Sequence, residues 1–177
     1  MKSVTKPRLF GAFTREVRSV IESAIKTECA VGANQCVCPH ADQCISPTVL
    51  NLCSGSWDFG ITVDRNHHEG HPPPHITADV QALPFRDECA DVVIFDPPYS
   101  KKYKKQYGTY YANRRQVFME VLRVLKPGGL LIFCHYFIPQ LRVLHLEDVY
   151  MIHNRPWEHV RALSFSRKQN TLMDIYQ

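Results

Sequence analysis

The chain has 177 residues, of which 45% are hydrophobic and 21% are charged, and its formal net charge at pH 7 is +4. This length and composition indicate one globular domain with a real core. No apolar run approaches the roughly 18 residues of a membrane span, and the basic residues 1–8 are not followed by the apolar region of an export signal. We therefore expect a cytoplasmic protein without a membrane partner. The mild positive charge permits an anionic partner without demanding one.

Residues 9–26 predict an amphipathic helix, because apolar side chains recur at spacings of three and four. The apolar positions are Phe10, Phe13, Val17, Val20, Ile21, Ala24 and Ile25. We expect this face to pack against a sheet.

A segment with four cysteines and no clear periodicity follows the helix. Its candidate metal ligands are Cys29, Cys36, Cys38 and Cys44, with His40 among them. Such a segment has little core of its own, and a tetrahedral metal would order it. We predict structural zinc held by the four thiolates, or by three thiolates and His40. An iron–sulfur cluster is the alternative metal centre, and unligated thiols or a redox pair are the alternatives without metal.

The remaining three of the seven cysteines are Cys53, Cys89 and Cys134. An odd number of cysteines without an export signal argues against a disulfide framework. We expect these three to pack as small apolar side chains in or near the core.

Residues 47–56 predict a first strand that runs into a turn at Gly55, and the next apolar strand, residues 60–64, follows closely. A parallel crossover normally takes about a dozen residues and includes a helix. Six or seven extended residues span at most about 20–24 Å. We therefore predict that the first crossover helix is missing or reduced to a turn, with Trp57 and Phe59 covering the sheet in its place or flanking a ligand.

Two further strands are predicted before the middle of the chain. Residues 76–79 form a short third strand, and the apolar residues 92–95 predict a fourth strand that is buried on both faces. The fourth strand runs into Asp96-Pro97-Pro98-Tyr99, where the prolines end it because they have no N–H for a ladder. In open α/β sheets this carboxyl edge is where ligands bind.

Asp96-Pro97-Pro98-Tyr99 after an apolar strand resembles the (D/N)PPY motif of class I S-adenosylmethionine-dependent methyltransferases, in particular those that methylate exocyclic amines of nucleobases. The helix predicted at residues 116–125, the following Lys126-Pro127-Gly128-Gly129 and the strand at 130–137 are also common in this family. The resemblance covers roughly residues 48–167.

The resemblance implies an α/β fold with a Rossmann-like, mostly parallel sheet and an antiparallel C-terminal strand. We expect the closing antiparallel pair at residues 149–153 and 160–165. The chain then divides into an N-terminal helix plus cysteine-rich segment, residues 1–46, and a methyltransferase core, residues 47–177.

The resemblance also implies the catalytic residues. The Asp96 carboxylate and the Pro97 carbonyl would accept hydrogen bonds from the amine and stabilise the positive charge that develops on it. Pro98 would keep this carbonyl rigid, and Tyr99 would stack on the extruded base.

For S-adenosylmethionine, the resemblance implies that Asp64 binds the ribose hydroxyls and that Asp79 accepts from the adenine amine. The full set of implied cofactor residues is Asn51, Cys53, Ser54, Gly55, Asp64, Asp79, Val80 and Asp96. The first motif departs from the family pattern, because Asn51 stands at the usual acidic position and Gly55 alone remains of the usual glycines.

Residues 100–115 combine six basic side chains with four tyrosines and no acid. This combination suits phosphate contact and base stacking, whereas a charge run elsewhere is usually a solvated face. The predicted substrate-binding residues are Lys101, Lys102, Tyr103, Lys104, Lys105 and Tyr107.

We therefore predict an enzyme that methylates adenine N6 or cytosine N4 in DNA or RNA. The alternatives are an RNA guanine-N2 methyltransferase, a non-catalytic nucleic-acid-binding subunit that keeps the fold, and a small-molecule amine methyltransferase. The chain leaves no room for a separate target-recognition domain. Recognition of duplex DNA would then need a partner, a homodimer or the small parts outside the core.

Overall fold

The computed structural model describes residues 13–35, 47–67, 69–98, 113–152 and 160–169, with the backbone alone for residues 29–35. None of the helices in these ranges is long and apolar enough to cross a lipid bilayer. The elements are α1 (Arg15–Gln35), β1 (Val49–Leu52), β2 (Ile61–Asp64), β3 (Ile76–Thr77), β4 (Ala90–Phe95), α3 (Arg114–Val124), β5 (Leu125–His135), β6 (Leu144–Ile152) and β7 (Arg161–Lys168).

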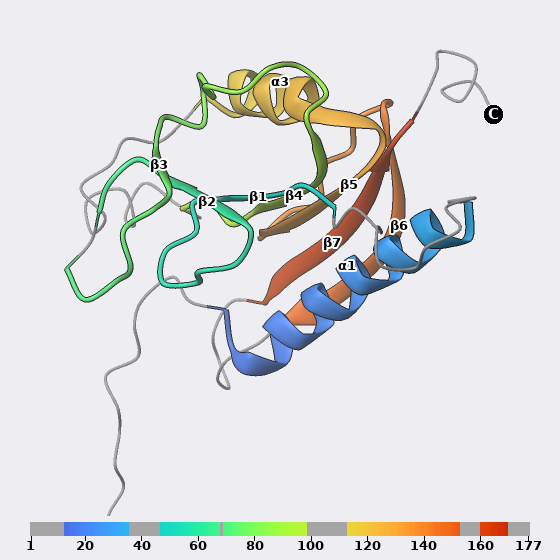
Figure 1. Ribbon diagram of the computed structural model, residues 1–177, viewed down its shortest axis with the longest axis horizontal. Coiled ribbons are helices and arrows are strands. Elements are labelled where there is room, and N and C mark those ends of the chain that lie inside the picture. The colour runs from blue at the N-terminus through green and yellow to red at the C-terminus, as the bar shows by residue number, and fades with distance from the viewer. Residues whose placement is uncertain (1–12, 36–46, 68, 99–112, 153–159, 170–177) are drawn as a thin grey trace, which may run out of the picture.

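The strands form a single seven-stranded sheet in the order β3-β2-β1-β4-β5-β7-β6 (Figure 1). Neighbours from β3 to β5 are parallel, and β7 pairs antiparallel with both β5 and β6. The chain proceeds from β1 outward through β2 and β3, and then returns to β4 on the other side of β1. The predicted Rossmann-like sheet with an antiparallel C-terminal end is therefore confirmed, and its topological switch point lies between β1 and β4.

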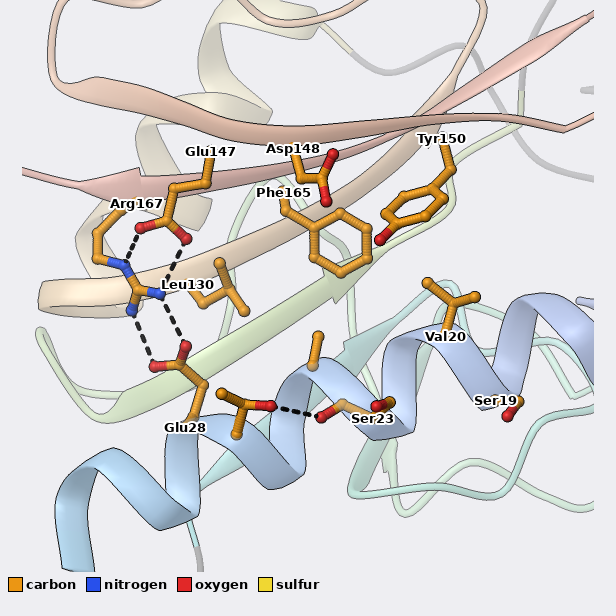
Figure 2. Close-up of a pocket in the computed structure, with 12 residues that line it drawn as sticks. Ser19, Val20, Ser23, Glu28, Leu130, Glu147, Asp148, Tyr150, Phe165 and Arg167 are labelled. Carbon is orange, nitrogen blue, oxygen red and sulfur yellow. Dashed lines mark hydrogen bonds and ion pairs between the residues drawn. The ribbon is translucent and has the colours of Figure 1, made fainter. Parts of the chain in front are cut away.

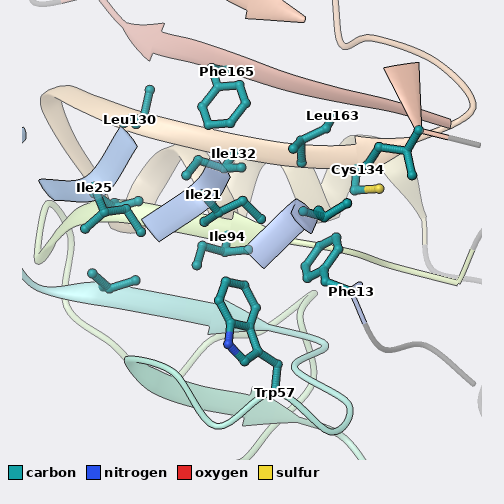
Figure 3. Packing of buried hydrophobic residues seen from close by; sticks show 14 residues of the cluster. Phe13, Ile21, Ile25, Trp57, Ile94, Leu130, Ile132, Cys134, Leu163 and Phe165 are labelled. Carbon is teal, nitrogen blue, oxygen red and sulfur yellow. The ribbon is translucent and has the colours of Figure 1, made fainter. Parts of the chain in front are cut away.

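Each face of the sheet has its own apolar core, with α1 on one face and α3 on the other (Figure 1). Side chains alternate along the strands, so that Ile94 of β4 faces α1 while its neighbour Phe95 faces α3. Figure 3 shows the α1-side cluster, in which Phe13, Ile21 and Ile25 pack over the sheet. The α3-side cluster includes Val117, Phe118, Val121 and Val124 from the helix.

No helix connects β1 and β2, as predicted, and residues 53–60 cross over as a short irregular loop. Trp57 covers the sheet in the place of that helix and is only 5% exposed. Its ring stacks on Phe59 with centroids 5.0 Å apart and meets Phe13 edge-on at 5.5 Å. Gly60 then allows the sharp entry into β2, because its φ is +67° and an added Cβ would lie 2.7 Å from the Val49 carbonyl oxygen.

Helix α1 begins at Arg15, so the prediction that residues 13 and 14 are helical is wrong, and it continues past its predicted end at Lys26 through Cys29 to Gln35. The prediction that residues 29–35 belong to an irregular segment is therefore wrong. Arg167 of β7 supplies a tertiary contact to this part of the helix, since its guanidinium donates to both Glu28 carboxylate oxygens at 2.7 and 2.8 Å. Because Glu28 and Arg167 are far apart in sequence, this contact could not be predicted from the spacing of residues along the helix.

Arg167 also joins α1 to the edge strand β6 (Figure 2). Its guanidinium donates to the Glu147 carboxylate at 2.6 and 2.9 Å, and both acidic partners raise the pKa of Arg167. A groove of about 730 Å³ remains between α1 and β6–β7, lined by Ser19, Ser23, Tyr150 and other residues of these elements. It lies away from the carboxyl ends of the parallel strands.

Two strands are longer than predicted at their amino ends. β5 begins at Leu125 directly after α3, where Leu125 pairs with Ala90 and Lys126 forms an ion pair with Asp91 at 2.7 Å. β6 begins at Leu144 and is paired along its length with β7. These polar and glycine-rich stretches have no strong strand pattern of their own, and pairing with a neighbour makes them strands.

Helix α3 begins where Asn113 caps it, because the Asn113 side chain accepts from the backbone N–H groups of Arg115 and Gln116. Glu120 and Arg123 on this helix then hold the loop that follows β3. The Glu120 carboxylate accepts from the Leu83 N–H at 2.8 Å, and the Arg123 guanidinium donates to the Leu83 and Phe85 carbonyls. This loop, rather than a helix, completes the cover of the α3 face over β1 and β4.

The three cysteines outside the cysteine-rich segment pack as predicted. Cys134 is fully buried in the α1-side cluster. Cys53 and Cys89 are half-buried and pack against the α3-side cluster.

Candidate active site

Three aspartates meet at the carboxyl edge of the sheet, beside the switch point. Asp64 ends β2, Asp79 follows β3, and Asp96 follows β4. All three carboxylates act electrostatically on Cys53, which follows β1. The sheet thus concentrates negative charge where its topology opens a crevice.

Cys53 forms the tight turn at the end of β1. It is a non-glycine residue with φ of +57°, and its N–H donates to the Val63 carbonyl at 2.8 Å. Burial raises the pKa of its thiol well above the usual range, and the carboxylates of Asp64, Asp96 and Asp79 raise it further. The thiol therefore stays protonated and is not a nucleophile at neutral pH.

Backbone amides fix two of the carboxylates. Asp64 accepts from the N–H groups of Gly55 at 3.4 Å and Asn66 at 3.3 Å. Asp79 accepts from the Gln81 N–H at 2.9 Å in a turn that also pairs the Asp79 carbonyl with the Ala82 N–H. Both side chains are half-buried at the edge of the site, so a ligand can reach them.

Asp96, Pro97 and Pro98 leave β4 on the other side of the switch point and are half-buried. The Asp96 N–H lies 3.5 Å from the Leu52 carbonyl of β1, so this turn is held against the end of the neighbouring strand. The structure thus brings Asp96 to the same edge of the sheet as Asp64 and Asp79, where all three carboxylates act on Cys53. Tyr99 and the predicted substrate residues Lys101, Lys102, Tyr103, Lys104, Lys105 and Tyr107 lie outside the described residues.

The other residues predicted to bind the cofactor are spread over the β1 turn and the loop after β3. The Asn51 side chain is buried and donates to the carbonyls of Trp57 at 3.1 Å and Phe59 at 3.3 Å, so its amide ties down the short crossover loop. Ser54 is buried, and Gly55 has φ of +55°. Val80 is half-buried against the α3-side cluster.

Most of the predicted metal ligands lie outside the described residues. Cys36, Cys38, His40 and Cys44 lie outside the described residues, and Cys29 lies in α1. Within the described ranges, no group of three or more His, Cys, Asp or Glu side chains could hold a metal ion. The zinc site and its iron–sulfur alternative stay predictions.

His135 also lies at the carboxyl edge of the sheet, and the sequence analysis did not single it out. It is the last residue of β5, is 4% exposed, and stacks on Phe133 with ring centroids 5.6 Å apart and planes 2° from parallel. Burial, together with the positive charge of Arg114, lowers its pKa to about 4. The sequence could have indicated this position, because His135 is a polar residue at the end of an apolar strand, as Asp96 is directly after β4.

The depressed pKa of His135 predicts a specific pH dependence of stability. Unfolding restores the ordinary value of 6.5, so between pH 6.5 and about 4 the unfolded chain binds more protons at this residue than the folded chain. The free energy of unfolding should therefore fall as the pH is lowered through this window, by about 3 kcal/mol at most from this group. Urea unfolding of wild type and His135→Phe at pH 7, 5.5 and 4.5 measures it. Parallel pH profiles for the two proteins would contradict the prediction.

Comparison with known proteins yields one curated relative and several solved structures. The ubiquinone/menaquinone biosynthesis C-methyltransferase UbiE of Blochmanniella pennsylvanica is 32% identical over 84 residues, which are 46% of this chain and only 29% of that protein. The 1,6-didemethyltoxoflavin-N1-methyltransferase of Burkholderia thailandensis is 13% identical, with a TM-score of 0.49 over 89% of this chain and 91% of the other. The N-methyltransferase NodS of Bradyrhizobium japonicum is 12% identical, with a TM-score of 0.48 over 68% of this chain and 76% of the other.

The family comparison is more extensive. The methyltransferase domain model matches residues 30–133, which is more than half of the chain and includes β1 to β4 and all but the last two residues of β5. The chain therefore belongs to the methyltransferase domain family.

Proposed function

We propose that the protein transfers a methyl group from S-adenosylmethionine to an exocyclic amine of a nucleobase in DNA or RNA, at adenine N6 or cytosine N4. The observation that carries the proposal is the placement of Asp96-Pro97-Pro98 directly after β4, beside the switch point and at the same edge of the sheet as Asp64 and Asp79.

The three carboxylates fit the cofactor that the family uses. S-adenosylmethionine carries a sulfonium and an ammonium group, and a cluster of carboxylates stabilises positive charge. Asp64 is held with its oxygens at the end of β2, where two acceptor atoms suit a ribose diol. Asp79 in its turn is suited to accept from an adenine amine. When bound, the cofactor supplies an electrophilic methyl group, so that an N–C bond forms as the C–S bond breaks.

The acceptor side of the reaction depends on Asp96 and Pro97. The lone pair of an exocyclic amine is delocalised into the ring, so the amine is a weak nucleophile. The Asp96 carboxylate and the Pro97 carbonyl would accept its two hydrogens and stabilise the positive charge as the methyl group arrives. Pro97 and Pro98 have fixed φ angles, so the carbonyl needs little reorganisation. The proton released from the methylated amine then passes to Asp96 and to solvent.

The experiment that tests this function measures binding and transfer separately. Calorimetric titration with S-adenosylmethionine and S-adenosylhomocysteine should show micromolar binding. Radiolabelled methyl donor should then label single-stranded DNA, duplex DNA or RNA oligonucleotides at adenine or cytosine. Nucleic-acid affinity should fall steeply with salt, because phosphate binding releases counterions. Cofactor binding without label in any nucleic acid would overturn the proposal.

A second candidate is methylation of a small molecule, which is favoured by the partial match to a quinone-biosynthesis C-methyltransferase. A neutral small substrate would show almost no salt dependence of its affinity, in contrast to a polyanion. The same salt series therefore separates the two candidates.

The placement of Asp64 predicts its effect on cofactor affinity. Asp64→Asn should weaken S-adenosylhomocysteine binding by about ten- to hundredfold, because a hydrogen bond to a charged acceptor contributes about 1.5–3 kcal/mol. Calorimetry measures the change, and Glu69→Gln on the exposed loop after β2 removes one carboxylate as the matched control. Unchanged affinity in Asp64→Asn would mean that the ribose is held elsewhere.

A further inference from the structure

The position of His135 follows from the pairing of β4 with β5. These strands are parallel, with Ile94 opposite Ile132 and Phe95 opposite Phe133. Continuing this register by two residues places Pro97 opposite His135. Pro97 and His135 each lie two residues beyond the last paired residues, at the carboxyl edge of the sheet, so His135 ends β5 on the same edge as the backbone that is proposed to receive the amine.

The chemistry of His135 differs from that of the strand before it. Residues 130–134 are apolar and almost fully buried, and His135 continues the α3-facing row of Leu131 and Phe133. Burying a polar ring there costs free energy that an apolar residue would not. A buried polar group at the catalytic edge of a sheet is a candidate for function.

The surroundings of His135 keep its imidazole neutral and stacked on Phe133, with Phe137 tilted against it. Phe137 lies 4.4 Å from it between ring centroids, and the Arg114 guanidinium lies 4.7 Å from the centroid of Phe137. Burial and the charge of Arg114 both disfavour protonation of the imidazole. A neutral imidazole offers one N–H donor and one acceptor, and it does not oppose positive charge developing on a nearby amine.

We propose that His135 is a specificity-determining residue of the acceptor site, whose imidazole N–H donates to the ring nitrogen beside the target amine. This inference rests on the proposed function. The ring nitrogen is N1 in adenine and N3 in cytosine, and both are hydrogen-bond acceptors. The N2 amine of guanine differs, because its neighbouring ring nitrogens are N1, which carries a hydrogen, and N3, which is an acceptor. The Phe137 ring, with Arg114 above it, forms the adjoining wall, which suits a base edge and its phosphate.

The test combines a protein substitution with a substrate substitution. His135→Phe keeps an aromatic ring on Phe133 but removes the donor, and 1-deazaadenine or 3-deazacytosine in the oligonucleotide removes the acceptor. On the natural base, His135→Phe should lower kcat/KM for the nucleic acid by about ten- to hundredfold. On the deaza base, the kcat/KM values of wild type and His135→Phe should agree within about threefold, because the substrate has already lost the acceptor of the hydrogen bond.

Controls separate this role from a structural one. His135→Gln keeps an N–H donor and should recover part of the loss, while His145→Phe on the exposed edge strand makes the same chemical change away from the site. S-adenosylhomocysteine affinity should stay within a few-fold of wild type in all variants. If His135→Phe does not fold, wild type alone decides: a loss on the deaza base of less than about threefold overturns the inference.

The outcomes distinguish this inference from the proposed function. Equal activity of wild type and His135→Phe on the natural base, or the same loss on both bases, overturns the role of His135 and leaves nucleobase methylation intact. A wild-type protein that binds the cofactor and labels no nucleic acid overturns both.

Discussion

Replacing Asp96 with alanine is expected to lower the rate of methyl transfer by at least about a hundredfold, while affinity for S-adenosylmethionine stays within a few-fold. Removing one preorganised group that stabilises transition-state charge typically costs a factor of about 10²–10³ in rate. Asp96 is placed for this role at the end of β4, where its N–H is held near the Leu52 carbonyl at 3.5 Å. Cofactor affinity changes little because Asp64 and Asp79 remain on their own turns.

Single-turnover assays with labelled methyl donor measure the rate, and calorimetry measures cofactor affinity. Asp96→Asn keeps one acceptor oxygen and the shape of the side chain, so its loss should be smaller than that of Asp96→Ala. Asp148→Ala removes one exposed carboxylate on β6 at the far edge of the sheet and should leave the rate unchanged. Full turnover in Asp96→Ala would remove the carboxylate from the mechanism.

Replacing Trp57 with alanine is expected to lower the free energy of unfolding by about 3–5 kcal/mol, the usual cost of deleting a large buried aromatic ring. Trp57 occupies the place of the missing crossover helix and packs with Phe13, Phe59 and the sheet. Neighbouring elements cannot collapse into the space, because the loop is tied to Asn51 and α1 is held by Arg167. The cavity would therefore persist.

Urea or thermal unfolding followed by circular dichroism measures this loss. Trp57→Phe keeps part of the ring and should cost less than half as much, and Met119→Ala, at a side chain that is 62% exposed, should change stability by less than about 0.5 kcal/mol. A Trp57→Ala variant as stable as wild type would show that the crossover loop contributes little to the core.

Several features could be predicted from sequence because they depend on neighbouring residues. The apolar run of β4 followed by two prolines fixes a strand and its end, and the short interval between Leu52 and Ile61 excludes a crossover helix. Asp64, Asp79 and Asp96 each follow a strand, which places them at one edge once the sheet is parallel. Local spacing thus predicted these strands and the short crossover, while the resemblance to class I methyltransferases implied the fold class and the candidate site residues.

The tertiary structure decided the rest through contacts between distant residues. Arg167 of β7 donates to Glu28 near the end of α1. The side-chain amide of Asn51 donates to the Trp57 carbonyl and so holds the crossover loop. His135 was proposed as a site residue only because the structure ends β5 at the same edge of the sheet as Asp96 and buries the imidazole. The sequence alone determined which segments are strands and where β2 and β4 end, because steric and hydrogen-bonding limits act locally. The register, the burial and the electrostatic neighbours of each side chain were decided by packing, because those depend on which distant segments meet.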